Sequence, residues 1–410
     1  MGTKNVNQDL ETTWMIDTSN DTYTLNAAAQ ITTEGEYAIN VVWGNNNDNI
    51  ILKGDVKASG TNRVVSVEGN GHHLQVAKTS HIDGTDANVG VYSNGANFTM
   101  VNAGRIEGDS SAVTVDDFAE IKNSGKILSD QVGIGGGEGL QLTNSGKVEG
   151  DVYGVLADSA GAAINNLQDG KIMSAGTAVY LMDGGDALIK NTGLIQGQFA
   201  IIDGDGDAEI INKGTISGNV NLGEGDDLFN TRAGTFEGIV NGGDGDDTYV
   251  IGKSNIQIEE QPAFGTDTVK STVSFTLGEN LEDLILQGTK DVNGTGNGAN
   301  NTITGNKGDN VLKGMAGDDY LIGGKGNDRL FGGANEDMFD FRKGTGHDVV
   351  EDFVNGEDVI YTPFASNEAD LLANHLTQKN GGVLLSYGDD SLFIKGATLA
   401  ELDESDFFTI

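Results

Sequence analysis

A block of five nine-residue segments, from residue 296 to residue 340, holds the residues best suited to chemistry. Each segment opens with glycine, has asparagine or aspartate at its sixth position and an apolar residue at its eighth. The sixth-position residues are Asn301, Asn310, Asp319, Asp328 and Asp337. Glycines permit positive φ and can turn backbone carbonyl groups inward, and the sixth residue adds side-chain oxygen. A ligand set made only of oxygen suits a hard cation with a high and flexible coordination number, which favours Ca²⁺ over Mg²⁺ or Zn²⁺.

Each nonapeptide predicts one turn followed by one short strand. Six residues form the turn, and the eighth-position side chain of the strand points into a core. These core residues are Ile303, Leu312, Leu321, Leu330 and Phe339. Successive nonapeptides then lie on opposite edges of a coil, so loops two segments apart stack. We expect shared calcium sites between the loops of Asn301, Asp319 and Asp337 on one edge, and between those of Asn310 and Asp328 on the other.

Three acidic loops upstream extend the expected metal binding. They span 203–207, 223–227 and 243–247, recur at steps of 20 residues, and end in Asp207, Asp227 and Asp247. If one coil takes about 20 residues, these loops stack directly. Like charges a few ångströms apart repel one another, so a row of cations between the loops is expected. The interpretation is two stacks of sites, separated by a less regular strand segment.

Regular glycine corners further upstream predict a long repeat. The corners are Gly104, Gly125, Gly146, Gly170, Gly193, Gly214 and Gly234, at steps of 20 to 24 residues. This period with short alternating strands is typical of one coil of a parallel β-helix. The apolar residue two positions after each corner would stack into an interior ladder. Glycine or asparagine at a corner fits a turn that needs φ > 0.

The nonapeptide block resembles the repeat of the RTX haemolysin-type calcium-binding protein family, Gly-Gly-x-Gly-x-Asp-x-apolar-x. The match is close at 314–331 and 242–250, and looser where Asn301 replaces Asp and Asn335 replaces the fourth-position Gly. Segments 265–269, 344–350 and 405–410 are similar to RTX flanks and tails. The resemblance implies a parallel β-roll, calcium-dependent folding and type I export. It adds further residues to the expected calcium sites: Gly225, Gly245, Asp267, Asp309, Gly317, Gly326 and Asp348.

The patterns together predict an all-β fold class, a right-handed parallel β-helix (β-solenoid) followed by an RTX parallel β-roll with a small C-terminal cap. The expected parts are a polar lead over 1–22, the β-helix over 23–240, and a first RTX segment with an irregular linker over 241–293. The nonapeptide β-roll over 294–340 and a cap with a type I secretion signal over 341–410 follow. In the cap we expect one short helix over 366–379 and a hairpin through 383–395.

Composition restricts the partners. The chain has 410 residues, a formal net charge of −38 and no Cys. Nucleic acid and anionic membranes would repel this charge. No apolar stretch approaches the roughly 20 residues that span a bilayer, and no signal-peptide pattern opens the chain. These facts predict a protein with no disulfide framework whose export would use an uncleaved signal. Together with the RTX resemblance, which implies type I secretion machinery and a C-terminal signal, we expect an extracellular protein.

Evidence for an enzyme is weak in the sequence. There is no His-Glu-x-x-His zinc motif and no Gly-x-Ser-x-Gly elbow, which disfavours a metalloprotease or a serine lipase. The acid or base candidates are His72 and His73, His81 with Asp83, and Asp116 with Asp117; none has a spacing that specifies a reaction, and solvated surface is expected for each. The aromatic residues Trp14, Trp43, Tyr92 and Tyr180 are more typical of core or scattered surface than of a sugar-binding face.

Two functions therefore remain open. The favoured one is a non-enzymatic, secreted calcium-binding adhesin, matrix or host-interaction protein. The alternative is a polysaccharide-modifying lyase or epimerase with its site on the flank of the N-terminal β-helix, so extracellular polysaccharide or a cell surface is a partner in both cases. A row of Asp, Arg, Lys or His across three or more adjacent coils would favour the enzyme. A smooth flank of Thr, Asn and Ser would favour the structural role.

Overall fold

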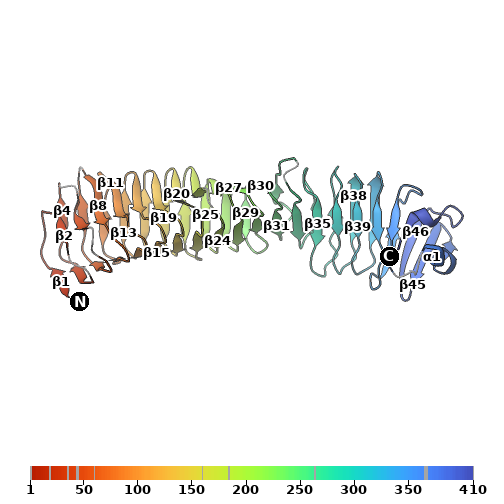
Figure 1. Ribbon diagram of the computed structural model, residues 1–410, viewed down its shortest axis with the longest axis horizontal. Helices are drawn as coiled ribbons and strands as arrows, with labels where there is room; N and C mark the ends of the chain where they lie inside the picture. The colour runs from red at the N-terminus through yellow and green to blue at the C-terminus, as the bar shows by residue number, and fades with distance from the viewer. Residues whose placement is uncertain are drawn as a thin grey trace. The chain divides into compact units, whose positions relative to one another are not determined.

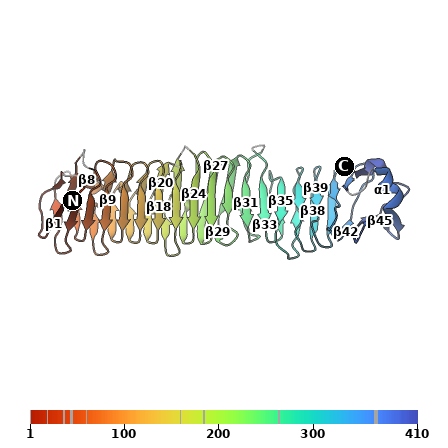
Figure 2. The ribbon, with the colours of Figure 1, turned by 60° about the horizontal axis from the view of Figure 1, so that its bottom comes forward.

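The structure is a computed structural model, and it describes residues 2–17, 20–34, 37–42, 46–59, 61–158, 160–182, 185–262, 265–363 and 368–409. It divides into two compact units, Met1–Gly243 and Asp244–Ile410. Within each unit, short strands of successive coils lie side by side and pair in parallel (Figures 1 and 2). The expected all-β parallel solenoid is confirmed. Within the described ranges, no helix is long and apolar enough to cross a membrane.

Coils of the first unit contribute one strand to a first sheet and two strands to a second sheet. The first-sheet strands are β1 (Thr3–Val6), β3 (Thr22–Leu25), β6 (Asn49–Leu52), β9 (His73–Val76), β12 (Thr99–Asn102), β15 (Glu120–Asn123), β18 (Gln141–Asn144), β21 (Ala163–Asn166), β24 (Ala187–Asn191), β26 (Ala208–Asn212) and β28 (Leu228–Asn230). The first 22 residues, expected to be a polar lead, already supply two strands, because β1 pairs with β3 and β2 (Trp14–Ile16) pairs with β5 (Ile39–Val41).

The remaining second-sheet strands follow the same coils. They are β4 (Ile31–Thr33), β7 (Val56–Ala58), β8 (Thr61–Val67), β10 (His81–Asp83), β11 (Ala87–Ser93), β13 (Arg105–Gly108), β14 (Ser111–Thr114), β16 (Lys126–Ser129), β17 (Val132–Gly136), β19 (Lys147–Gly150), β20 (Tyr153–Asp158), β22 (Lys171–Met173), β23 (Thr177–Met182), β25 (Leu194–Ile202), β27 (Thr215–Glu224), β29 (Thr235–Glu237) and β30 (Ile239–Asp244).

A continuous apolar ladder fills the interior of the first unit. The residue two positions after each corner stacks on its equivalent in the next coil, as Ile106 does on Ile127 and Ile127 on Val148. All seven of these residues are buried: Ile106, Ile127, Val148, Ile172, Ile195, Ile216 and Phe236. Parallel in-register stacking places identical strand positions on the same face. The predicted interior ladder is therefore confirmed.

The corners do not use the positive φ that the sequence predicted for them. None of the seven corner glycines has a positive φ. A side chain at Gly125 would instead place its Cβ 2.0 Å from the carbonyl oxygen of Gly104, and one at Gly146 would lie 2.1 Å from that of Gly125. Close approach of the neighbouring coil is thus the reason for glycine at these positions.

The corner asparagines form a buried ladder. The side-chain amide of Asn102 donates to Asn123 Oδ1 at 2.8 Å, Asn123 donates to Asn144 at 2.8 Å, and the pattern continues through Asn166 and Asn191 to Asn212. In five of the six asparagines, Oδ1 also accepts the backbone amide of the corner glycine two residues on, as Gly104 N donates to Asn102 at 3.0 Å. Asn166 is the exception, and its side-chain amide donates to Gly170 O at 3.2 Å. Both ends of each side chain are therefore satisfied, which buried amides require.

Coils of the second unit are shorter and carry two strands each. First-sheet strands are β31 (Thr248–Ile251), β33 (Thr268–Ser271), β35 (Asp283–Leu286), β37 (Thr302–Thr304), β39 (Tyr320–Ile322), β41 (Met338–Asp340), β43 (Val359–Tyr361) and β47 (Phe407–Phe408). Third-sheet strands are β34 (Phe275–Thr276), β36 (Gly294–Thr295), β38 (Val311–Ala316), β40 (Arg329–Ala334), β42 (His347–Val350) and the cap strands β44 (Leu376–Lys379), β45 (Gly382–Tyr387) and β46 (Asp390–Lys395). Strand β32 (Gln257–Ile258) belongs to the second sheet.

Successive nonapeptides feed opposite sheets, as predicted. Tyr320 pairs with Met338 in the first sheet, and Val311 pairs with Arg329 in the third sheet. Both pairs are two nonapeptides apart, so one coil takes 18 residues. The eighth-position residues Ile303, Leu312, Leu321, Leu330 and Phe339 are fully buried.

The cap differs in part from its prediction. The hairpin is present as antiparallel β45 (Gly382–Tyr387) and β46 (Asp390–Lys395). The helix α1 covers only Glu368–Asn374, and residues 366 and 367 lie outside the described residues. Expected helical residues Leu376–Lys379 form strand β44 instead, because their backbone groups pair with β45. A short 3-10 helix, Glu404–Asp406, precedes β47.

Candidate functional site

Sixth-position residues form a row along one edge of the nonapeptide block. Asn301, Asp319 and Asp337 each directly precede a first-sheet strand and are at most 3% exposed. The backbone amide of Asn301 donates to Asp319 Oδ1 at 2.8 Å, and that of Asp319 donates to Asp337 Oδ1 at 3.0 Å. Asp337 N continues the row by donating to Asp358 Oδ1 at 3.0 Å. The structure therefore brings together the three residues predicted for this edge.

The other edge carries an equivalent row. Asn310 N donates to Asp328 Oδ1 at 2.7 Å, and Asp328 N donates to Asp348 Oδ1 at 2.9 Å. All three side chains are buried. Asp348, expected from the flanking segment alone, thus stands in line with the sixth positions.

These aspartates keep one oxygen for another ligand. The Oδ2 atoms of Asp319, Asp328 and Asp337 are buried and have no hydrogen-bond partner among the described residues. Burial raises the pKa of Asp319 to about 6, and that of Asp328, Asp337 and Asp348 to about 7, even though backbone amide donors lower each pKa. A buried carboxylate without compensation is unfavourable.

The donor set fits calcium. Asp319 and Asp337 would hold the ion on one edge, and Asp328 and Asp348 on the other, since carboxylate oxygen is a preferred ligand of Ca²⁺. When bound, a calcium ion would compensate the negative charge of these buried carboxylates. The residues themselves fix the row, because one oxygen of each aspartate is already committed to the backbone of the preceding coil.

The first-position glycines make room for these carboxylates. A Cβ at Gly314 would lie 2.1 Å from Asp319 Oδ2, and one at Gly332 would lie 2.2 Å from Asp337 Oδ2. At the second position, Gly324 and Gly333 adopt φ of 96° and 115°, and Met315 adopts φ of 94° despite its side chain. The two glycines that open the repeat are therefore needed for different reasons. The first leaves space for the aspartate side chain, and the second adopts a positive φ.

Other predicted residues of the block lie in the loops rather than in the buried rows. Gly317 and Gly326 have φ of 106° and 125°. Asp309 is exposed, and its Oδ1 accepts from Asn327 N at 2.8 Å. Asn335 keeps a left-handed φ of 87° where the family repeat has glycine.

The row continues upstream through Asp247 and Asp267, both expected at calcium sites, to Glu282, which sequence reasoning missed. Asp247 N donates to Asp267 Oδ1 at 2.9 Å, and Asp267 N donates to Glu282 Oε2 at 2.8 Å. Glu282 O then accepts from Thr302 N at 3.0 Å, next to Asn301. The prediction that the less regular segment separates two stacks of sites is therefore wrong, because the row of hydrogen-bonded side chains runs through it. The available signal was an acidic residue directly before an alternating strand, which Asp358 also shows.

A compact carboxylate group lies at the start of this row. One oxygen each of Asp247, Glu260 and Asp267 lies within 4.8 Å of the others, and all three residues are buried. Tyr249 Oη donates to Glu260. Burial raises the pKa of Asp267 to about 7, with Glu260, Asp247 and Glu282 adding to the rise. Gly245, in the preceding loop, has φ of 128°.

The acidic loops of the first unit stack as predicted; Asp203 and Asp227 are buried there, whereas Asp207 is not. Asp207 is exposed and accepts Asp226 N at 2.9 Å, and Asp227 Oδ1 accepts Ala208 N at 2.6 Å. Gly225 has φ of 121°. Asp203 is 2% exposed, both of its oxygens lack a hydrogen-bond partner among the described residues, and burial raises its pKa to about 7.

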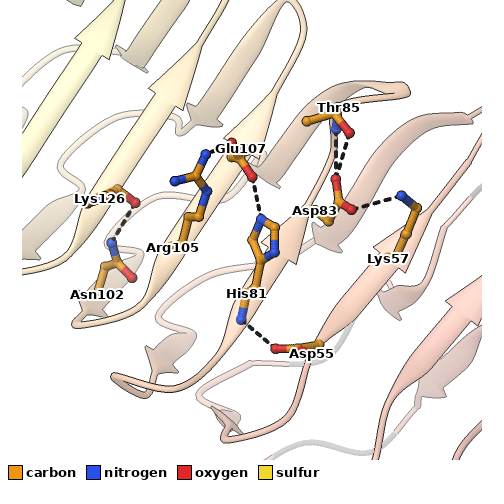
Figure 3. Close-up of polar contacts among 9 residues, drawn as sticks. All are labelled: Asp55, Lys57, His81, Asp83, Thr85, Asn102, Arg105, Glu107 and Lys126. Carbon is orange, nitrogen blue, oxygen red and sulfur yellow. Dashed lines mark hydrogen bonds and ion pairs between the residues drawn. The ribbon is translucent and has the colours of Figure 1, made fainter.

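A charged cluster spans three adjacent coils on the flank of the first unit (Figure 3). His81 Nε2 contacts Glu107 Oε2, and Arg105 donates to Glu107 Oε1. Lys57 Nζ lies 2.8 Å from Asp83 Oδ2. His81, Asp83 and Glu107 each offer one ligand atom within 4.8 Å of the other two. We define these five residues, Lys57, His81, Asp83, Arg105 and Glu107, as the flank cluster.

Both carboxylates of the flank cluster are held in the charged form. Burial disfavours the Asp83 carboxylate, but hydrogen bonds from Lys57 and Thr85 outweigh burial and lower its pKa to about 2. The hydrogen bond from Arg105 lowers the pKa of Glu107 against burial. The expectation of plain solvated surface for His81 and Asp83 is therefore wrong. Sequence reasoning missed Glu107, because 26 residues separate it from His81.

The other acid or base candidates contact residues of neighbouring coils. His72, expected on the surface, is fully buried, and its Nδ1 lies 3.6 Å from Asp48 Oδ2. His73 Nδ1 lies 2.7 Å from Thr99 Oγ1 on the first sheet, and burial lowers its pKa. Asp117 Oδ1 accepts Glu138 N at 3.1 Å. Burial of His72 follows from its place directly before β9, where its imidazole accepts Asp48 N from the previous coil.

The aromatic candidates are dispersed. Tyr180 stacks on Tyr153 with ring centroids 5.4 Å apart, and Tyr92 lies under the guanidinium of Arg63 at 3.3 Å. Trp14 packs edge-on against Tyr23 at 6.1 Å. Trp43 lies outside the described residues.

Comparison with known proteins agrees with the geometry of the second unit. Residues 295–330 and 316–350 match the model of the RTX calcium-binding nonapeptide repeat (four copies). No curated protein matches the chain. Among solved structures, the extracellular lipase LipA from Serratia marcescens is similar at 17% identity over 55% of this chain and 40% of the lipase, with a TM-score of 0.27. The chain thus spans less than half of the length of that lipase. Residues 295–350 therefore carry RTX nonapeptide repeats, and RTX nonapeptide repeats bind calcium.

Proposed function

We propose that the protein is a secreted calcium-binding β-solenoid that folds on calcium outside the cell and acts there as a non-enzymatic adhesin, matrix or host-interaction protein. The observation that carries the proposal is the pair of buried aspartate rows, in which Asp319, Asp328 and Asp337 each keep one oxygen without a partner among the described residues. RTX repeats are typical of secreted proteins, and the residues after 340 are proposed to include a type I secretion signal.

Linkage gives the proposal a mechanism. An ion that binds only the folded state stabilises it by RT ln(1 + [L]/Kd), about 2.7 kcal/mol per independent site at a hundredfold excess over Kd. Where calcium is scarce, the acidic rows repel and the roll stays open for export. Where calcium is abundant, the ions neutralise the rows and the roll closes.

Circular dichroism of the whole chain tests this mechanism. We expect β content and the melting temperature to rise on addition of Ca²⁺ and to fall on addition of a chelator, with Mg²⁺ as the matched control ion. Unchanged β content and melting in chelator would overturn calcium-dependent folding. Secretion is tested separately, by comparing the culture medium of cells that express the whole chain with that of cells lacking residues 341–410.

A second candidate function rests on the flank cluster. Its charged residues come from β7, β10 and β13 of three adjacent coils, the arrangement expected for a polysaccharide lyase or epimerase. His81 would act as a base oriented by Glu107, while Lys57 and Arg105 would bind substrate carboxylates. Both cations already pair with carboxylates of the cluster, which favours the non-enzymatic role.

One assay separates the two functions. Calcium-loaded protein is incubated with a panel of acidic polysaccharides, and both retention and product formation are scored. Products that disappear in His81→Ala but not in Lys190→Ala, an exposed lysine of the first sheet, would establish the enzyme. Retention without product supports the adhesin or matrix role.

A further inference from the structure

One turn position of the first unit recurs with a left-handed backbone in seven coils. It lies two residues before each first-sheet strand from β3 to β21. Six of the seven residues are Asn or Gly, the types that tolerate this conformation. Their φ values are 59° for Asn20, 60° for Asn47, 70° for Gly71, 59° for Asn97, 55° for Phe118, 69° for Gly139 and 69° for Gly161. Phe118 is the single bulky residue among these described positions.

Folding alone does not account for phenylalanine at this turn. Its left-handed φ is strained for a bulky side chain, and its side chain is 52% exposed, so burial offsets little of the strain. Its ring lies above the next coil, where a Cβ on Gly139 would be 2.5 Å from Phe118 Cδ1. The turn therefore supports one part of the ring and presents the rest to solvent.

The presented ring opens onto a groove. Residues Phe118, Glu138, Gln141 and Asp186 line a shallow groove of about 620 Å³, with Gly139, Ala160, Gly161 and Gly185 completing the lining. Because these residues are glycine or alanine, no large side chain fills the bottom of the groove. A second groove continues over the following coils and shares Gln141, Gly161 and Asp186 with the first. A volume in this range is typical of ligand sites.

The polar lining selects against anions. Glu138 and Asp186 supply carboxylates, Gln141 supplies an amide, and no Lys or Arg is among the lining residues. Neither carboxylate forms an ion pair with a described residue. Carboxylate and amide oxygens accept hydrogen bonds from hydroxyl groups. An exposed aromatic face stacks on flat apolar surfaces.

We infer that this groove binds a neutral glycan, with a sugar ring stacked on Phe118 and hydroxyl groups donating to Glu138, Gln141 and Asp186. The inference rests on the proposed surface-binding role and names a ligand class for it. Because coils repeat along the grooves, a linear chain contacts several of them at once. The site is distinct from the flank cluster, whose cations suit acidic sugars.

Phe118→Asn tests the inference without harming the fold, since Asn97 holds the same turn one coil earlier. Calcium-loaded wild type and variants are titrated with soluble neutral polysaccharides (glucan, mannan, galactan and chitin oligosaccharides) by calorimetry. We expect binding by wild type, an affinity loss of at least tenfold in Phe118→Asn, and retained binding in Phe118→Tyr. Leu167→Ala removes another exposed apolar side chain of the unit and should bind as wild type. The melting temperature of Phe118→Asn should equal or exceed that of wild type.

Two results would overturn the inference. One is equal binding by wild type and Phe118→Asn. The other is a wild type that binds no neutral glycan while it is still retained by acidic polysaccharide or by cell surfaces, which leaves the proposed surface role intact. Absence of any retention on glycans, matrix or cells would count against both.

Discussion

The backbone amide of Asp319 donates to Asp337 Oδ1 at 3.0 Å, one 18-residue coil further along the chain. This bond positions the Asp337 carboxylate and leaves its Oδ2 buried without a partner among the described residues. Repetition of the same bond from coil to coil produces the acidic rows of the RTX block.

Removing one charge from a row should weaken calcium binding without breaking the coil. In Asp319→Asn the side chain can still accept Asn301 N, as the natural Asn301 and Asn310 show that asparagine fits this position. We expect calcium affinity at that edge to fall roughly tenfold or more, measured by calorimetry. Asp318→Asn is the matched control, since its side chain is exposed. Equal loss in both variants would mean that general charge, not the row, holds the ion.

Calcium and protons should compete for the rows. Burial raises the folded-state pKa of Asp328, Asp337 and Asp348 to about 7, above the unfolded value near 3.9. A raised pKa contributes stability that is fully present below about pH 4 and lost as pH rises to about 7. The calcium-free roll should therefore melt at a lower temperature at pH 7 than at pH 5, and added calcium should raise melting more at pH 7. A melting temperature in calcium-free buffer that increases from pH 5 to pH 7 would contradict the raised pKa values of these aspartates.

Met315 should be a point of backbone strain. Its φ of 94° matches that of Gly324 and Gly333 at the same repeat position, and its side chain is 53% exposed. Met315→Gly should stabilise the calcium-loaded protein by about 1 kcal/mol, because it relieves strain and loses little burial. Thermal unfolding at constant free calcium measures the effect. Met315→Ala keeps the Cβ and should show no comparable gain; an equal gain in both would assign the effect to the exposed side chain.

A methyl group at a solenoid corner should be costly. In Gly125→Ala the new Cβ would meet Gly104 O at 2.0 Å, so two coils must move apart. We expect destabilisation on the order of 1–3 kcal/mol, measured by denaturant unfolding. Gly298→Ala is the control, since nothing lies within 4 Å of its Cβ. Tolerance of Gly125→Ala would overturn the explanation by close approach of the adjacent coil.

The sequence alone determined the features that depend on spacing along the chain. The nonapeptide step predicted the alternation of edges, the buried eighth positions from Ile303 to Phe339, and the all-oxygen chemistry of the sixth positions. The corner step predicted the interior ladder from Ile106 to Phe236. These features are local and repeat at a regular step, so they can be predicted from the spacing of residues along the chain.

Only the tertiary structure decided which side chains from different coils meet. Coil length varies in the first unit, so no single step relates His81 to Glu107, and the exposure of Phe118 beside Gly139 depends on a neighbouring turn. Glu282 and Asp358 join the calcium row through strand register, although neither belongs to a nonapeptide. The corner glycines have their reason in the closeness of the adjacent coil. Contacts between coils depend on register and backbone separation, which only the stacked coils define.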